Sequence, residues 1–204
     1  MLLATSRLEA QQVNNAGPFV SLHVGQFWAQ SQEFLDHYGS NPATVFDGCF
    51  GYHVSTRINT CVRLIYQPSS KSLESRVVET LDPLQYSIRR RVTKNHLWIL
   101  NPGFEFLFVN TDHLSLGAGL GGLIGNATEE KSGTVYVYQG REFVETEDFG
   151  VAGLVTSLTV EMKIQDTSLS LVLGGQYRYA PPLSSIFTMD YSGTTVDLGI
   201  RCNL

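Results

Sequence analysis

The sequence has little charge and no long apolar segment. Lys, Arg, Asp and Glu make up 16% of the 204 residues and hydrophobic residues 43%, so the chain is neither disordered nor typical of a soluble surface. No run of about 18 apolar residues occurs, which excludes a transmembrane helix. The net charge of −5 disfavours nucleic acid as a partner.

Residues that carry common catalytic and metal chemistry are also scarce. Three Cys residues are too few for a disulfide framework, and no Cys/His cluster has the spacing of a metal site. The chain contains no Gly-x-Ser-x-Gly stretch, and His37 beside Asp36 is the kind of loop pair that is usually solvated. We therefore predict no catalytic residue, no metal and no cofactor.

The sequence shows instead a regular alternation of apolar and polar residues, as in "LTVEMKI" at 158–164. Such alternation is typical of β-strands with two different faces. Nineteen glycines and many Phe and Tyr residues fit strands and turns. We predict eight strands, each on the order of 10 residues, the length that a tilted strand needs to cross a bilayer. They lie at about 18–29, 43–54, 57–67, 95–109, 114–125, 150–164, 168–180 and 194–204.

Each predicted strand has one apolar and one polar face. Leu22 and Phe50 belong to the apolar face, whereas His23 belongs to the polar face. Glycines such as Gly117 interrupt the polar face, where long side chains would need room. A soluble sandwich or lipocalin turns its apolar face inward, whereas a membrane barrel turns it toward lipid. Alternation alone does not distinguish these two folds.

Loop lengths do distinguish them. The predicted connections at 55–56, 110–113 and 165–168 are short, whereas the others have about 13 to 27 residues. Short turns on one rim and long loops on the other are typical of outer-membrane barrels. Aromatic residues at strand ends, such as Trp28 and Tyr177, fit the girdles of such a barrel. The sequence therefore predicts an all-β fold, an eight-stranded antiparallel up-and-down transmembrane β-barrel.

Two stretches, "NPGFEFLFVNTDHLSLGAGLGGLIGN" and "TTVDLGIRCNL", resemble strands of small bacterial outer-membrane proteins of the OmpA-like eight-stranded β-barrel superfamily. The resemblance covers roughly 18–204 and implies a Gram-negative outer membrane, with its lipid and lipopolysaccharide as partners. Residues 1–17 do not have the pattern of a secretory signal, so either a signal has been removed or the protein is not exported by that route. We expect removal, because the rest of the chain has the pattern of an exported protein. We expect 1–17 to be an N-terminal periplasmic segment and 18–204 a single barrel domain.

Several charged residues on the polar faces would point into the barrel. An eight-stranded interior is just wide enough to be filled by side chains, and buried charges must be paired. We interpret these residues as a lumen charge network that makes the barrel rigid; an ion path through the lumen is the alternative. The network comprises Asp47, Arg57, Arg63, Glu105, Glu161, Lys163, Arg178, Asp197 and Arg201.

Cys49 and Cys61 share the inward parity on neighbouring strands. A hairpin that pairs His53 with Arg57 would place Cys49 opposite Cys61. Directly opposed Cβ atoms can come within disulfide range, and an exported location is oxidising. The sequence therefore identifies a possible cross-strand disulfide, with two free buried thiols as the alternative.

The long loops differ in charge. The loop at about 68–94 contains Arg89, Arg90 and Arg91, and the loop at about 126–149 is acidic. The three arginines could contact lipopolysaccharide or a partner protein, and hairpin strands could extend beyond the membrane. We predict a non-enzymatic membrane anchor or accessory subunit that binds a partner protein or lipopolysaccharide. The alternatives are a narrow ion channel, a lipid A-modifying enzyme and a soluble lipocalin-like barrel.

Overall fold

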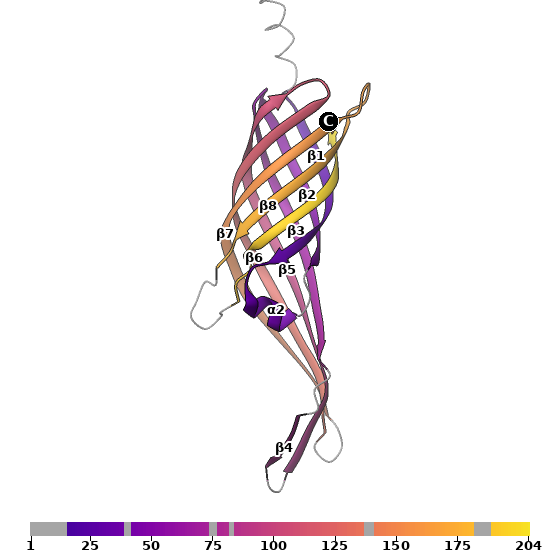
Figure 1. Ribbon diagram of the computed structural model, residues 1–204, viewed down its shortest axis with the longest axis vertical. Coiled ribbons are helices and arrows are strands. Elements are labelled where there is room, and N and C mark those ends of the chain that lie inside the picture. Colours follow the sequence, from indigo (N-terminus) through magenta and orange to yellow (C-terminus); the bar gives the residue numbers. More distant parts are fainter. Residues whose placement is uncertain (1–15, 39–41, 74–76, 82–83, 137–140, 182–188) are drawn as a thin grey trace, which may run out of the picture.

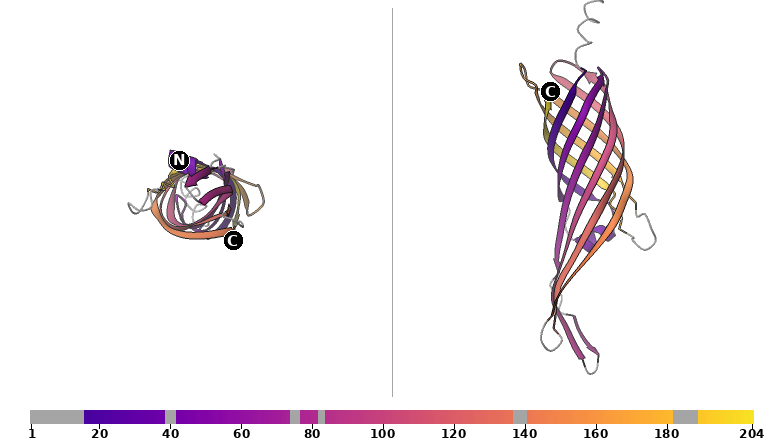
Figure 2. Two further views of the ribbon diagram at one scale, coloured as in Figure 1. Left: turned by 90° about the horizontal axis from the view of Figure 1, so that it is seen from below. Right: turned by 180° about the vertical axis from the view of Figure 1, so that it is seen from behind.

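Tilted antiparallel strands close into a barrel, and long hairpins project from one of its rims (Figure 1). The computed structural model describes residues 16–38, 42–73, 77–81, 84–136, 141–181 and 189–204. The predicted N-terminal segment 1–17 thus lies almost wholly outside the described residues. We call the rim with the short connections the turn rim and the opposite one the loop rim. The C-terminus lies at the turn rim (Figure 2), where Leu204 N donates to Pro18 O.

Eight strands form the barrel wall, and the pairing of β3 with β5 completes its closure. A ninth strand, β4 (Val77–Leu81), pairs with β5 beyond the barrel, and a short helix, α2 (Gln32–Tyr38), follows β1. No described helix is long and apolar enough to cross a membrane. The predicted eight-stranded barrel is confirmed. The wall strands are β1 (Pro18–Ala29), β2 (Ala43–Ser55), β3 (Ile58–Leu73), β5 (Leu84–Asn110), β6 (Leu114–Tyr136), β7 (Arg141–Lys163), β8 (Leu169–Tyr179) and β9 (Gly193–Asn203).

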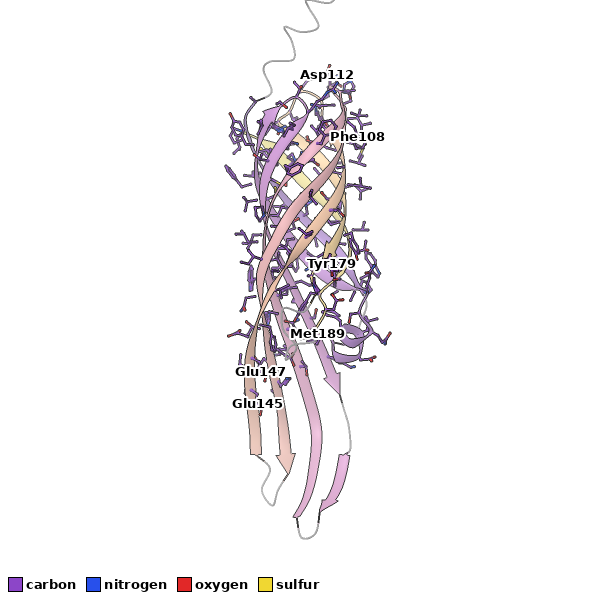
Figure 3. All side chains as sticks on the ribbon, turned by 90° about the vertical axis from the view of Figure 1, so that its left-hand side faces the viewer. Phe108, Asp112, Glu145, Glu147, Tyr179 and Met189 are labelled. Carbon is purple, nitrogen blue, oxygen red and sulfur yellow. The ribbon has the colours of Figure 1, made fainter. Side chains whose placement is uncertain are left out.

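Residues of the wall alternate between a buried interior and an exposed exterior. In β1, Ser21 and His23 are buried inside the barrel, whereas Leu22 between them is 74% exposed. The exterior carries large apolar side chains, with Phe108 and Tyr179 toward opposite rims (Figure 3). In water, each such side chain would lose the roughly 1.5–3 kcal/mol of free energy that burial provides, so this surface suits hydrocarbon. The soluble lipocalin-like alternative requires the opposite arrangement and is wrong.

Aromatic rings mark the end of the apolar exterior toward the loop rim. Trp28, Trp98 and Tyr177 are exposed there. The Tyr66 and Trp98 rings lie 4.4 Å apart between centroids, and the Tyr66 hydroxyl lies 2.8 Å from His96 Nδ1. Such rings have an apolar body and a polar tip, so they suit the boundary between hydrocarbon and water.

Glycines inside the barrel make room for polar side chains. A Cβ atom at Gly199 would lie 2.5 Å from the His23 ring, and one at Gly117 would lie 2.9 Å from Cγ of Glu105. Both distances are too short for real Cβ contacts, so larger residues here would displace His23 and Glu105. The prediction that lumen glycines leave room for long side chains is therefore confirmed at Gly117.

Four wall strands continue beyond the loop rim. β3 stays paired with β5 as far as Leu73, which lies opposite Arg91. β5, β6 and β7 stay paired as far as Ser87, Tyr136 and Arg141, and β4 adds to the edge of β5 (Figures 1 and 2). We call β4 and residues 84–95, 126–136 and 141–153 the protruding sheet. The predicted loops at 68–94 and 126–149 are therefore largely strand, because their alternation continues past the membrane. The predicted extension of hairpins beyond the membrane is confirmed.

Candidate functional site

Buried ion pairs fill the middle of the lumen. Arg201, which is 1% exposed, donates from Nη1 to Glu161 Oε2 at 2.7 Å, and its Nη2 lies 3.8 Å from Glu105 Oε2. Arg63 Nη1 donates to Asp47 Oδ2 at 2.9 Å. Arg63 and Asp47 lie on the neighbouring strands β3 and β2, whereas Arg201 on β9 joins Glu161 on β7 and reaches Glu105 on β5, in the opposite wall.

Neutral groups add hydrogen bonds to both sets of ion pairs. Gln176 Nε2 donates to Asp197 Oδ2 at 3.1 Å and to Asp47 Oδ2 at 3.4 Å, which bridges two carboxylates. Asn59 Nδ2 donates to Glu105 Oε2 at 2.8 Å. The Arg201 guanidinium also lies 4.4 Å from the centroid of the Phe19 ring. A network in which most members are satisfied makes the interior rigid.

Arg178 lies apart from the carboxylates. Its Nη2 donates to Gln67 Oε1 at 2.9 Å, and its guanidinium lies 4.5 Å from the centroid of the Phe27 ring. Among the described residues, no carboxylate pairs with this buried side chain. Arg178 therefore belongs to the lumen as predicted, but it is held by an amide and an aromatic face.

Arg57 and Lys163 do not join the network, contrary to the prediction. Arg57 lies in the turn between β2 and β3 and is exposed, because strand alternation does not extend into a turn. Lys163 is the last residue of β7 and lies at the turn rim. Its Nζ donates to Asn110 Oδ1 at 2.8 Å and to Thr111 O at 2.7 Å. Lys163 therefore closes a turn instead of neutralising a lumen carboxylate.

The register between β2 and β3 also differs from the prediction. The observed turn lies at Thr56–Arg57, between the paired residues Ser55 and Ile58, and not between His53 and Arg57. Together with a one-residue bulge between His53 and Ser55, this turn places Arg63 opposite Cys49 and Gly51 opposite Cys61, which differs from the predicted register by two residues. Cys49 and Cys61 are therefore diagonal neighbours instead of opposed residues, and both are free thiols.

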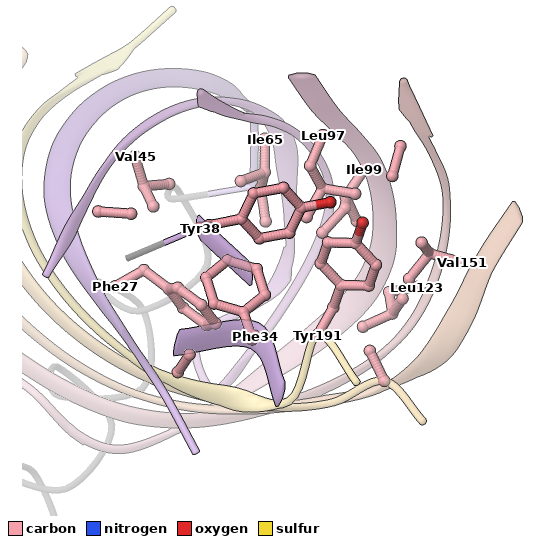
Figure 4. Close-up of a cluster of buried hydrophobic side chains, with 14 of the residues drawn as sticks. Phe27, Phe34, Tyr38, Val45, Ile65, Leu97, Ile99, Leu123, Val151 and Tyr191 are labelled. Carbon is pink, nitrogen blue, oxygen red and sulfur yellow. The ribbon is translucent and has the colours of Figure 1, made fainter. Parts of the chain in front are cut away.

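The first connection of the loop rim folds back into the barrel. Phe34 and Tyr38 of α2 enter the mouth and pack against Phe27 and Tyr191 (Figure 4), with ring centroids 4.8 to 6.0 Å apart. They join a buried cluster that includes Ile99 on the wall. We call α2 and this cluster the apolar plug. Sequence reasoning missed it because a helix of seven residues in a loop has no distinct period.

A polar chain links the apolar plug to the protruding sheet. The Tyr38 hydroxyl donates to Glu129 Oε2 at 3.0 Å, and Lys131 Nζ contacts both Glu129 at 3.1 Å and Glu147 at 2.9 Å. Burial, with the nearby Tyr191 and Glu129, raises the pKa of Tyr38, so its hydroxyl remains a donor. Partial burial alone would lower the pKa of Lys131, but hydrogen bonds to Glu147 and Glu129 raise it. These polar contacts hold α2 in the mouth of the barrel.

Basic and acidic strands lie side by side in the protruding sheet. Lys94 on β5 lies opposite Glu130 on β6, with Nζ and Oε1 3.5 Å apart. Arg89–Arg91 lie on β5 farther from the barrel. Their contact with lipopolysaccharide or a partner remains a prediction. Basic and acidic segments thus lie next to each other as paired strands.

Comparison with solved structures identifies this fold. The Ail protein of Yersinia pestis, solved in complex with the heparin analogue sucrose octasulfate, matches with a TM-score of 0.50 and 14% identity, over 93% of this chain and 99% of that one. Neisserial surface protein A matches with a TM-score of 0.44 and 14% identity, over 92% and 97%. The N-terminal β-barrel domain of Pseudomonas aeruginosa OprF matches with a TM-score of 0.41 and 8% identity, over 95% and 100%. No family model and no curated protein matches. The chain has the fold of the eight-stranded outer-membrane β-barrels.

The predicted location of this outer-membrane barrel is confirmed by the same fold and by its exterior. The apolar wall between the aromatic ends provides the surface that a bilayer requires, and the closed sheet leaves no unpaired edge within it. The turn rim is therefore the periplasmic rim, and the loop rim with the protruding sheet faces the cell surface.

The lumen of the outer-membrane barrel is nearly solid. A cavity of about 20 Å³ lies between Arg63, Glu105 and Arg201, which is room for about one water molecule. A larger cavity of about 270 Å³ opens at the periplasmic rim beside His53 and Lys163. The ion pairs and the apolar plug lie between this opening and the cell surface.

Three lumen residues have the geometry of a Ser-His-Asp triad. His23 Nδ1 lies 2.8 Å from Asp197 Oδ1, and His23 Nε2 lies 2.9 Å from Ser21 Oγ. These are the contacts that activate a serine nucleophile. However, Ser21 is 2% exposed inside the closed wall, and it lines neither the small lumen cavity nor the cavity at the periplasmic rim. The apolar depression that Ser21 and His23 border is lined mainly by the exposed outer residues Leu22, Leu198 and Ile200, so it lies on the lipid-facing side of the wall. The triad therefore orients Asp197 and has no space for a substrate.

We expect a fluorophosphonate probe to leave Ser21 unmodified. The intact barrel in lipid nanodiscs should show no mass increase by intact-protein mass spectrometry, because the probe cannot reach the Ser21 hydroxyl. Ser21→Ala serves as the control, and its spectrum should match that of the parent apart from the substitution. Labelling of the parent that disappears in Ser21→Ala would establish a reactive serine and contradict a purely structural triad.

Proposed function

We propose that this outer-membrane barrel is a non-enzymatic, non-conducting anchor that presents the protruding sheet to a partner protein at the cell surface. The observation that carries the proposal is the continuation of β5, β6 and β7 beyond the loop rim as paired strands. Residues 144–148 of β7 are all exposed, whichever face of the sheet they lie on. The sheet is therefore free to contact another molecule.

Rigidity supports a binding role for the protruding sheet. Its strands are direct continuations of the barrel wall, and Lys131 links β6 to β7 through Glu147. A surface held in one conformation loses little entropy when a partner binds, so it binds more tightly than a flexible loop of the same composition. The barrel thus serves as a rigid base for the sheet.

The filled lumen supports an anchor over a channel. Arg201 pairs with Glu161 inside the lumen and reaches Glu105 on the opposite wall, and Phe34 and Tyr38 close the mouth above them. An ion crossing the barrel would have to displace both the ion pairs and the apolar plug. An eight-stranded interior filled in this way has no continuous aqueous path.

Protein binding is favoured over lipopolysaccharide binding by the pairing of the sheet's cations. Lys94 and Lys131 already contact Glu130, Glu129 and Glu147. Their charge is therefore compensated within the sheet, which weakens attraction for anionic sugars and phosphates. Binding of lipopolysaccharide through Arg89–Arg91 is the second candidate, and the Ail structure with a sulfated sugar shows that a similar barrel takes an anionic ligand.

Site-specific photo-cross-linking tests the proposed role. A benzophenone amino acid at position 144 of the protruding sheet should form protein adducts in native outer membranes. The matched control is position 158 on the lipid-facing wall, because Val144 and Leu158 are 67% and 65% exposed. Position 158 should cross-link to lipid only. Protein adducts from position 158 and none from position 144 would assign the interface to the barrel wall and refute the proposal.

A further inference from the structure

β7 has a long unpaired edge in the protruding sheet. Its pairing with β6 extends to Arg141, whereas its pairing with β8 begins only at Leu154. Within the described chain, no strand therefore pairs with the outer edge of residues 141–153. At about 3.3 Å per residue, this edge is roughly 40 Å long. It begins where the barrel wall leaves the membrane.

The hydrogen bonds of β7 show which backbone groups face this edge. Lys163 N donates to His113 O on the β6 side, and Ile164 N donates to Leu169 O on the β8 side. The β6–β7 register contains no bulge, so odd residues of β7 bond toward β6 and even residues toward the outer edge. The N–H and C=O groups at the outer edge belong to Glu142, Val144, Thr146, Asp148, Gly150 and Ala152.

The edge is strongly acidic. Residues 141–148 contain Glu142, Glu145, Glu147 and Asp148, with Arg141 as the single basic residue. Among the described contacts, Glu147 pairs with Lys131, while the exposed Glu145 has no ion pair. Two copies of this edge in antiparallel pairing would place carboxylates opposite one another, which is unfavourable. A second copy of the chain is therefore a poor occupant, whereas a basic strand is complementary.

Apart from its acidic side chains, the edge lacks the usual obstacles to strand addition. Exposed edges are commonly protected by being short, by bulges, by Pro, or by charged side chains, especially Lys. Residues 141–153 contain neither Pro nor Lys, and their pairing with β6 has no bulge. The backbone of the edge is thus available for pairing with another strand, and the acidic side chains favour a strand of positive charge.

We propose that an extended, lysine- or arginine-rich segment of the partner protein adds to β7 as the next strand of the protruding sheet. The backbone groups of the even residues hold the segment, and the carboxylates select its charge. This inference rests on the proposed function and specifies its binding surface and the chemistry of its partner.

A peptide-binding experiment tests the inference. The probe is a fluorescent ten-residue peptide in which Lys alternates with Thr, and binding to the full-length barrel in lipid nanodiscs is followed by fluorescence anisotropy. Thr146→Pro removes an N–H group that faces the outer edge, and it leaves the β6–β7 hydrogen bonds in place. We expect Thr146→Pro to weaken binding at least tenfold. Thr146→Val keeps the N–H group and should bind like the parent.

Further comparisons separate the outcomes. A peptide with Glu in place of Lys should not bind, because the edge repels it. Val144→Pro, at the next edge position, repeats the test should Thr146→Pro fail to fold. Equal affinity of the Pro and Val variants for the Lys/Thr peptide would overturn the inference. The acidic residues of the β7 edge would then serve only to prevent aggregation. The proposed function would still be supported by protein adducts from position 144. It is refuted separately when position 144 gives no protein adduct.

Discussion

Replacing Arg201 with Met is expected to destabilise the barrel by about 3 to 5 kcal/mol, because it leaves buried carboxylates without their cation. Arg201 contacts Glu161 at 2.7 Å and Glu105 at 3.8 Å, and these carboxylates are only 3% and 6% exposed. The free energy of unfolding can be measured by urea titration in lipid vesicles. Trp28 and Trp98 at the membrane boundary provide the fluorescence signal.

Two control variants identify the cause of this loss. Lys163→Met removes a cation at the rim, where each of the two Lys163 hydrogen bonds contributes roughly 1 kcal/mol. It should therefore lower the free energy of unfolding by less than Arg201→Met does. Arg201→Met combined with Glu161→Gln and Glu105→Gln removes the uncompensated charge and should recover at least half of the loss. A triple variant as unstable as Arg201→Met would show that packing of the Arg201 side chain, and not its charge, stabilises the lumen.

Replacing Phe34 with Ala is expected to release the apolar plug. Phe34 is buried and packs against three aromatic rings, and Phe-to-Ala changes at such sites cost about 3 to 5 kcal/mol. Because the wall strands keep their own hydrogen bonds, the loss should fall on α2 alone. Backbone amides of α2 should then exchange with deuterium roughly a hundredfold faster or more, as measured by mass spectrometry.

The same variant tests whether the apolar plug gates a pore. Gln32→Ala is the control on α2, because Gln32 is exposed and bonds only Asp36 within the helix. In planar bilayers, the parent, Gln32→Ala and Phe34→Ala should all lack steady openings, because the Arg201–Glu161 pair still fills the lumen beneath the plug. Steady, ion-selective current from Phe34→Ala would make the plug a gate and the barrel a channel.

Alternation in the sequence predicted much of the candidate site. Asp47, Arg63, Glu161 and Arg201 all have the inward parity, and all four lie buried in the lumen. Parity could not predict that Arg201 would bond Glu161, because strand order and register determine which side chains meet across a lumen. Nor could it predict the triad of Ser21, since its Asp197 comes from the far end of the chain.

Two errors show where local patterns stop being informative. The predicted Cys49–Cys61 pairing depended on where the β2–β3 turn lies, and the observed turn at 56–57, with a bulge near Ser55, gives another register. The loops at 68–94 and 126–149 were predicted too long. A strand that leaves the membrane no longer needs an apolar face, so its pattern is weaker than that of a membrane-spanning strand. In both cases the missing information was which residues lie opposite on the neighbouring strand.

The sequence by itself determined that this protein is a barrel with an apolar exterior. The two-residue period of a strand is local and assigns every side chain to one face, and the short turns on one rim with long connections on the other indicate that the apolar face meets lipid. The tertiary structure alone decided the ion-pair partners, the apolar plug and the free edge of β7. Each of these depends on register and closure, which arise from contacts between residues far apart in the chain.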